Sequence, residues 1–310
     1  MANPKFGVIY SRLHPVFPIP EFARTIEDSG YDSLWVTEGL VNEMPALDIM
    51  LALGAFVQHT RRLTVGTCVV LVPLRNPAIL AKETASLDFL SGGRVVLGVG
   101  VGGSSNSRMD AFKVCGVDPR ERGARTDETL EIMTKLWSGG PVSHKGRFHS
   151  FDGIEMGPIP VQKPHPPLWA GGEAEGVLRR AARWCQGFVP SNPGVQEYSR
   201  MWERIEGYAE RYGTDPSKIT KAVHLYFCMG DSRENARNRV RATLAQRYGF
   251  EPHLPDPRAI LVGTPDDCAQ TIEDHMKVGM THFVLNAARP LPEVKADYER
   301  FAETVLPKFR

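Results

Sequence analysis

The sequence predicts a single (β/α)8 TIM barrel of the α/β class over residues 1–310. Eight short apolar segments alternate with longer amphipathic segments, as in a parallel sheet covered by helices. The length of 310 residues suits one such barrel. No linker rich in proline, glycine or serine divides the chain. An open doubly wound sheet would need a topological switch point, which eight evenly spaced units do not indicate.

The apolar segments have the length and composition of buried parallel strands. The predicted strands are residues 6–10, 33–37, 63–72, 94–99, 168–170, 187–189, 222–229 and 281–285. The third of these, LTVGTCVVLV, is the most strand-like stretch of the sequence. Each segment precedes a helical pattern, so we expect every strand to return through a helix to its neighbour.

Helices are predicted where apolar residues recur at helical spacing. The predicted helices are residues 20–29, 47–57, 76–90, 125–137, 174–185, 195–212, 233–248, 264–278 and from about 292 to the end. Two of them begin with clear capping signals. Asn76 precedes Pro77, and Thr264 precedes a proline and two aspartates.

Two segments are longer than ordinary connections. Residues 139–167 are rich in proline, glycine and histidine, and we expect them to form a functional excursion. Within it, residues 142–151 predict a hairpin that turns at Lys145-Gly146. Extra elements also lie between strands seven and eight, where two helices flank a structureless stretch, residues 250–257.

Composition and charge exclude several classes of protein. The net charge is +1, with 42% hydrophobic and 24% charged residues and no basic block, so we expect no nucleic-acid partner. No apolar run reaches the length of a membrane span, and the N-terminus lacks the pattern of a signal peptide. The cysteines are widely spaced, which argues against disulfides and favours a cytoplasmic location. They are Cys68, Cys115, Cys185, Cys228 and Cys268.

One glycine-rich run fits a familiar pattern but is interpreted differently. Residues 98–103 match G-x-G-x-x-G. The run lies on the fourth strand, lacks a clear helix start and lacks a ribose-binding acid, so a dinucleotide-binding fold is not indicated. His144, His149 and His165 have no metal-ligand spacing with carboxylates, and we expect no metal site.

Four segments, taken together, resemble a known family. Residues 66–102, 121–137, 157–172 and 262–273 resemble the bacterial luciferase-like superfamily in sequence and in order. With residues 6–38 they cover most of the chain. The resemblance is greatest to the branch that uses the deazaflavin coenzyme F420, and FMN-dependent monooxygenases are the nearest alternative.

This resemblance implies an F420-dependent oxidoreductase that moves a hydride between C5 of the deazaflavin and an unidentified small organic substrate. A deazaflavin does not readily form an oxygen adduct, so it implies a reductase or dehydrogenase. FMN in the same place would allow a luciferase-like monooxygenase. A second alternative is a non-catalytic barrel that binds no cofactor. Similar proteins are commonly homodimers, which we also expect here.

Candidate catalytic residues are sought where strands end, because barrel chemistry occurs at that rim. Glu38 ends the second strand, where similar proteins carry an acid that is often followed by histidine; here Gly39 follows it. We expect Glu38 to face the cofactor ring and exchange a proton, with a solvated carboxylate or a salt-bridge partner as the alternative. Thr37 joins the expected cofactor contacts. His14, after the first strand, is expected to line the substrate pocket unless it lies on the surface.

The resemblance also indicates residues behind the cofactor ring. At Thr67, Cys68 and Val69 the family has a bulge and a non-proline cis peptide, whereas a plain strand is the alternative. Gly100 is expected to allow close backbone approach to the ring. Asn106 aligns with a family residue that contacts the cofactor, and a surface loop is its alternative.

An anion site is expected after the fifth and sixth strands. Gly171 and Gly172 precede a predicted helix start near Ala174, where backbone N–H groups favour a phosphate. In similar proteins this is the cofactor phosphate site, and Ser191 would complete it; the alternative is a tight turn. His224 lies within the seventh strand, and we favour a satisfied core histidine there.

Overall fold

Eight parallel strands close into a barrel in the computed structural model, which describes residues 3–10, 18–41, 46–248, 259–290 and 293–310. Strand β10 pairs with both β9 and β12, and β12 pairs with β1, so the ring is complete. The barrel strands, in order around the ring, follow, with β3 and β4 sharing one position. They are β1 (Lys5–Tyr10), β2 (Ser33–Val36), β3 (Thr64–Thr67) with β4 (Val70–Leu71), β5 (Val95–Gly100), β8 (Leu168–Ala170), β9 (Gly187–Phe188), β10 (Thr220–Met229) and β12 (His282–Ala287). The predicted barrel is confirmed.

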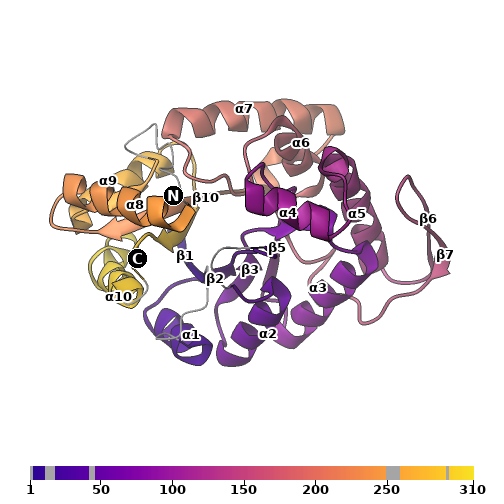
Figure 1. Cartoon of the computed structure of the whole chain (residues 1–310), viewed down its shortest axis with the longest axis horizontal. Coiled ribbons are helices and arrows are strands. Elements are labelled where there is room, and N and C mark those ends of the chain that lie inside the picture. The colour runs from indigo at the N-terminus through magenta and orange to yellow at the C-terminus, as the bar shows by residue number, and fades with distance from the viewer. Residues whose placement is uncertain (1–2, 11–17, 42–45, 249–258, 291–292) are drawn as a thin grey trace.

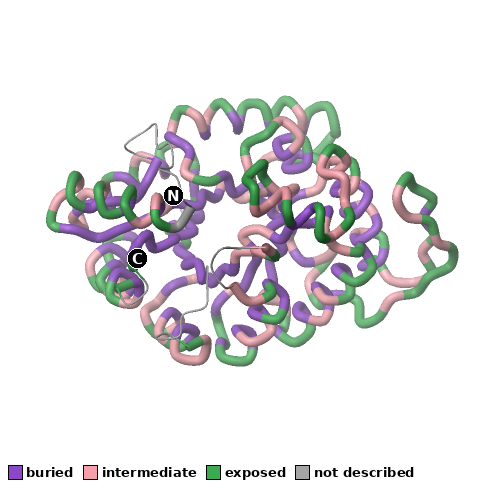
Figure 2. Tube along the Cα trace, in the orientation of Figure 1, coloured by how far each residue is buried: buried purple, intermediate pink, exposed green. Residues whose placement is uncertain are grey.

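Helices surround these strands (Figure 1), and their buried faces turn toward the barrel (Figure 2). Both predicted caps are present: Asn76 accepts from the N–H groups of Ala78 and Ile79, and Thr264 forms a capping box with Asp267. The α-helices are α1 (Ile19–Asp28), α2 (Ile49–His59), α3 (Pro77–Ser91), α4 (Asn106–Val114), α5 (Arg122–Trp137), α6 (Glu175–Trp184), α7 (Val195–Tyr212), α8 (Arg233–Tyr248), α9 (Pro265–Met276) and α10 (Val294–Thr304). Short 3-10 helices are η1 (Val72–Leu74), η2 (Pro119–Glu121), η3 (Pro216–Lys218) and η5 (Leu306–Phe309). Within the described ranges, no helix is both long and apolar enough to cross a bilayer.

Two elements were not predicted. Helix α4 occupies residues taken for a loop, because only Ala111 and Phe112 of it are buried and its apolar periodicity is weak. Strand β11 (Leu261–Gly263) extends the sheet by pairing with the end of β10. Its three residues are too few to show a strand pattern.

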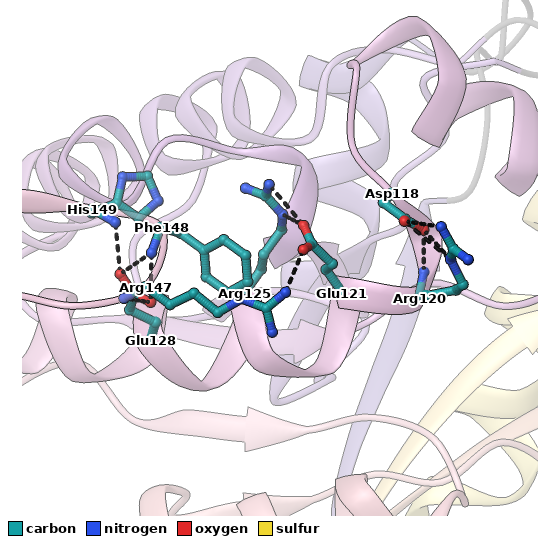
Figure 3. Close-up of polar contacts among 8 residues, drawn as sticks. All are labelled: Asp118, Arg120, Glu121, Arg125, Glu128, Arg147, Phe148 and His149. Atoms are coloured by element: carbon teal, nitrogen blue, oxygen red, sulfur yellow. Dashed lines mark hydrogen bonds and ion pairs between the residues drawn. The ribbon is translucent and has the colours of Figure 1, made fainter.

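The excursion forms the expected hairpin of β6 (Val142–Lys145) and β7 (Ser150–Ile154), which projects from the side of the barrel (Figure 1). Glu128 of α5 anchors it by accepting from the backbone N–H groups of Arg147, Phe148 and His149 at 2.8–3.0 Å (Figure 3). Burial opposes ionisation, but these hydrogen bonds hold the pKa of Glu128 below its usual range. A side chain at Gly146 would collide with Glu128. The described contacts therefore make the base of the hairpin a structural anchor.

Two indole rings fill the lower half of the barrel interior, meaning the half nearer the amino ends of the strands. The rings of Trp35 and Trp169 lie 4.9 Å apart between their centroids. Gly7, Gly66 and Gly187 leave room for them, because a Cβ at any of the three would overlap an indole. Small apolar side chains complete this layer, namely Ile9, Val96, Val189, Ala222 and Val284. The interior is therefore closed below, and only the carboxyl ends of the strands remain for a site.

Candidate functional site

A second layer of residues lies directly above the apolar one, at the carboxyl ends of the strands. Alternate residues of a strand face the same side, so each member follows an inward-facing residue by two positions. For example, Ser191, His224 and Asn286 follow Val189, Ala222 and Val284, all in the interior cluster. The layer comprises Thr37, Cys68, Gly98, Gly171, Ser191, His224 and Asn286. It forms the floor of the barrel mouth.

One half of this floor is apolar. The peptide bond between Cys68 and Val69 is cis and separates β3 from β4, so the bulge implied by the resemblance is present. The side chain of Val69 packs over Gly100 and Gly171, where a Cβ at either residue would overlap it. The bare glycines at this rim are thus explained by the bulge. Their contact with a cofactor stays a prediction.

Two members of the predicted cofactor set take different roles at the bulge. Thr67 is fully buried, and its hydroxyl donates to the carbonyl of Gly98 at 2.7 Å. It therefore lies within the barrel wall, and its contact with the cofactor stays a prediction. Burial raises the pKa of the Cys68 thiol to about 12. That thiol stays protonated at neutral pH and offers an apolar contact rather than a nucleophile.

The other half of the floor is a hydrogen-bonded network. Ser191 Oγ lies 2.8 Å from His224 Nδ1, and Asn286 Nδ2 lies 3.2 Å from His224 Nε2. Asn192 donates to Ser191 Oγ at 3.0 Å and accepts from the N–H of Tyr226 at 2.7 Å. Asn192 has a positive φ of 53°, a conformation that asparagine tolerates better than most residues. His224 is a satisfied histidine, as favoured from the sequence, but it lies in the mouth.

Asn286 is the member of this network that sequence analysis missed. Its signal was weak: a single polar residue two positions after an inward-facing valine, near the end of a strand. The residue is buried, and its Oδ1 atom has no hydrogen-bond partner among the described residues. Buried polar atoms without partners are uncommon, so this oxygen calls for an explanation.

Glu38 forms a salt bridge, which was the alternative to its predicted catalytic role. Its carboxylate accepts from the N–H of Leu71 and from Arg75, with 3.0 Å between Arg75 Nε and Oε1. Arg75 also pairs with Asp48, the N-cap of α2, at 2.9 Å. Both carboxylate oxygens of Glu38 are therefore engaged within the protein. The residue joins the end of β2 to η1 and α2, and its proton exchange with a cofactor or substrate stays a prediction.

Three further predicted site residues, Thr37, Asn106 and His14, differ in where they lie. Thr37 belongs to the floor and is half-buried. Asn106 is exposed in the first turn of α4, and its contact with a cofactor stays a prediction. His14 lies outside the described residues.

The expected anion site contains backbone N–H donors at the start of α6 and one acidic side chain, Glu173, that would compete with a bound anion. Gly172 has a φ of 120°, which favours glycine, and α6 begins without a side-chain cap at Ala174. The carboxylate of Glu173, however, accepts from the N–H of Ser191. Burial and the charge of Glu197 raise the pKa of Glu173, although this hydrogen bond offsets part of the shift. A phosphate here would replace or adjoin a carboxylate of the protein.

A cavity of about 530 Å³ lies at the opposite rim, beside the amino ends of β10 and β12. Lys221 Nζ stands 4.1 Å from the ring centroid of Trp202 in its wall. Barrel chemistry occurs at the carboxyl rim, so we do not assign the activity to this cavity. Among the described residues, no group of three or more histidine, cysteine, aspartate or glutamate side chains could hold a metal ion.

Comparison with known proteins agrees with the fold. Residues 15–282 match the model of the luciferase-like monooxygenase family. The chain is 27% identical to 4-hydroxyprotoasukamycin monooxygenase of Streptomyces nodosus subsp. asukaensis, over 100% of this chain and 93% of that protein. It is also 27% identical to the F420-dependent glucose-6-phosphate dehydrogenase of Amycolatopsis mediterranei (strain U-32), over 94% of this chain and 93% of that protein. An F420-dependent secondary alcohol dehydrogenase, solved with an F420-acetone adduct, superposes with a TM-score of 0.84 at 22% identity and covers both chains fully.

Proposed function

Because the chain belongs to the luciferase-like monooxygenase family, we propose that this oxidoreductase uses F420 to transfer a hydride to or from a small organic substrate at the barrel mouth. The observation that carries the proposal is the divided floor of the mouth. An apolar half, formed by Val69 over glycines, adjoins a half with hydrogen-bonding side chains. Such a floor suits a planar ring on one side and a polar reacting group on the other.

The residues present fit a deazaflavin. Cys68 and Val69 would support the ring, and Thr37 lies on the same floor. The N–H groups at the start of α6, after Gly172, would hold the phosphate. When bound in its reduced form, the coenzyme supplies a hydride from C5. The protein positions the substrate, excludes water and handles the accompanying proton.

A binding experiment tests the cofactor. Purified protein is titrated with F420 and with FMN, and fluorescence quenching is measured. We expect micromolar binding of F420 and at least tenfold weaker binding of FMN. The reverse preference would establish the FMN-dependent monooxygenase, which the relation to 4-hydroxyprotoasukamycin monooxygenase supports. Binding of neither cofactor would favour the cofactor-free barrel.

Glu173 provides a sharper test of the phosphate position. Its carboxylate lies at the proposed anion site, so Glu173→Gln should strengthen F420 binding by about three- to tenfold, because a like charge is removed. Glu203→Gln, an exposed change on α7, is the matched control and should leave affinity unchanged. The deazaflavin chromophore without its phosphate should bind both variants like the unaltered protein. If Glu173→Gln strengthened its binding equally, the phosphate would lie elsewhere.

We further propose that residues 1–310 act as one barrel domain and form a homodimer in the cytoplasm. Adjacent helices α2 and α3 expose several large apolar side chains, as an interface between two copies would require. These are Leu51, Ile79, Phe89 and Leu90. The described cysteines are all free thiols, as in a reducing compartment. Sedimentation as a monomer at micromolar concentration would reject the dimer.

A further inference from the structure

We propose that Ser191, His224 and Asn286 form a proton-transfer chain, in which the Ser191 hydroxyl exchanges a proton with the oxygen of a carbonyl or alcohol substrate. The proposal rests on the proposed hydride transfer. A hydride added to a carbonyl carbon leaves an alkoxide that needs a proton, and alcohol oxidation releases one. This role replaces the expected part of Ser191 in phosphate binding.

The backbone fixes the distance between the first two members of the chain. The N–H of Asn192 donates to the carbonyl of His224 at 2.8 Å, and the N–H of His224 donates to the carbonyl of Pro190 at 3.0 Å. Ser191 lies between Pro190 and Asn192, so its side chain is held beside the imidazole of His224. Serine and histidine are therefore placed by strand pairing rather than by a flexible loop.

The hydrogen bonds of the neighbours determine how Ser191 is oriented. Asn192 Oδ1 accepts from the N–H of Tyr226, so its Nδ2 faces Ser191 Oγ and donates to it. Asn286 Nδ2 donates to His224 Nε2, which leaves the proton of the neutral imidazole on Nδ1, directed at Ser191. Ser191 Oγ thus accepts two hydrogen bonds. Its own proton is available for the mouth, where the residue is exposed.

The buried oxygen of Asn286 explains how the chain accommodates a second proton. Oδ1 has no partner within the described part of the chain, while Nδ2 faces the imidazole. A half-turn of the amide presents Oδ1 to His224 in place of Nδ2. The oxygen can then accept from Nε2–H of an imidazolium. Asn286 can therefore hydrogen-bond to His224 in both forms. Its Nδ2 donates to the neutral imidazole, and its Oδ1 accepts from the imidazolium.

The proton step balances without a further reactant. During carbonyl reduction, the substrate oxygen takes the Ser191 proton while Ser191 Oγ takes the Nδ1 proton of the His224 imidazolium. His224 is left neutral with its proton on Nε2, where Asn286 Oδ1 accepts it, and a proton from solvent later returns to Nδ1. The electron pair is that of the hydride in the proposed function, and alcohol oxidation runs the same steps in reverse, starting from the tautomer with Nε2–H and Asn286 Oδ1 facing it.

Two titratable side chains, Tyr226 and Glu173, lie next to the chain. Among the described residues, the ring of Tyr226 lies 5.1 Å from that of His224 between centroids. On the neighbouring element, the carboxylate of Glu173 accepts from the N–H of Ser191.

The first test is made on the cofactor-free protein, so it does not depend on the proposed function. Nitrogen NMR of the histidine rings reports which ring nitrogen carries the proton, and His224→Gln identifies the signal of His224. We expect the neutral ring to carry its proton on Nδ1. We expect Asn286→Ala to shift the population toward Nε2–H by at least tenfold. A neutral ring with Nε2–H in the unaltered protein would overturn the chain.

The second test uses the enzyme loaded with reduced F420 and acetone, cyclohexanone or benzaldehyde as carbonyl probes. Ser191→Ala and His224→Gln should lower kcat by at least 100-fold, with KM and F420 affinity changed less than threefold. Ser191→Thr, which keeps a hydroxyl, should restore kcat to within about tenfold. Ser199→Ala on α7, whose hydroxyl bonds only to the carbonyl of Val195 among the described contacts, is the control and should keep full activity.

The outcomes distinguish failure of the proposed F420-dependent function from failure of the proton-transfer chain. Failure to bind F420 would reject the proposed function, while the NMR result would still decide whether the chain exists. Binding of F420 with no reduction of any carbonyl probe would overturn the substrate class. Equal kcat in Ser191→Ala and Ser199→Ala would overturn the role of Ser191.

Discussion

Two histidines lie inside the same barrel, one at each end, and their surroundings differ. Below, His282 Nε2 lies 2.8 Å from Ser33 Oγ, and the rings of Trp35 and Trp169 meet its imidazole edge-on. Burial lowers the pKa of His282 to about 3. Above, His224 is hydrogen-bonded at both nitrogens by polar side chains beside an unpartnered oxygen. Burial alone therefore does not reveal what a histidine does.

The difference follows from what lies around each ring. The lower histidine is surrounded by indoles and has no acceptor for a second proton among its described partners, so the neutral form is the stable one. The upper histidine adjoins an amide that can either donate or accept. The lower layer should therefore determine stability, and the upper layer should determine chemistry.

The largest effect is expected from overfilling the lower layer. In Gly7→Ala the new Cβ would overlap Ser33 Oγ and Trp35 Nε1, both buried. We expect the free energy of unfolding to fall by about 3 kcal/mol, measured by urea denaturation. Gly207→Ala, in an exposed part of α7 with no neighbour within 4 Å, is the control and should raise stability by up to about 1 kcal/mol. A loss below about 0.5 kcal/mol in Gly7→Ala would show that the lower layer is not tightly packed.

The next effect is a pH dependence of stability that arises from His282. The unfolded chain protonates this residue near pH 6.5, whereas the folded protein does so only near pH 3. The unfolded state therefore binds more protons between these values. The contribution of His282 is complete above pH 6.5 and falls by up to about 1.4 kcal/mol per pH unit below it.

The variant His282→Gln isolates this contribution. Free energies of unfolding are measured at pH 7, 6 and 5 for both proteins. The advantage of the unaltered protein over the variant should shrink as the pH falls. Parallel curves would mean that the folded protein accepts a proton on His282, contrary to the contrast with His224.

The smallest effect on stability is expected in the upper layer. Asn286→Ala removes one hydrogen bond to His224 together with a buried oxygen that has no partner. These two changes oppose each other, so we expect a loss below about 1 kcal/mol. Asn76→Ala removes the N-cap of α3 and should cost about 1 kcal/mol or more. A larger loss for Asn286→Ala than for Asn76→Ala would assign Asn286 to the structural core.

Much of the fold could be predicted from local patterns. All eight barrel strands were located within about three residues, and the caps at Asn76 and Thr264 are as expected. Helix α4 and strand β11 were missed because one is mostly polar and the other very short. The bulge at Cys68–Val69 came from the resemblance, since nothing in local apolar pattern distinguishes it from a plain strand.

The candidate site was less predictable than the fold. Glu38 was correctly placed at a strand end, but its partner Arg75 follows 37 positions later and belongs to another element. Likewise, the relation of Ser191 to His224 and Asn286 depends on three strands meeting around a ring. The residues next to a side chain in the sequence do not indicate which residues, tens of positions away, it will contact in the folded protein.

The sequence by itself determined the alternation of strands and helices, because apolar periodicity and capping act over a few residues. Only the tertiary structure decided which strand-end side chains share the mouth, and that Glu38 is engaged while Asn286 keeps an unpartnered oxygen. Barrel closure joins residues separated by up to hundreds of positions, and hydrogen bonds depend on differences of tenths of an ångström. That is why the barrel could be foreseen while the hydrogen-bonded network at its mouth had to be observed.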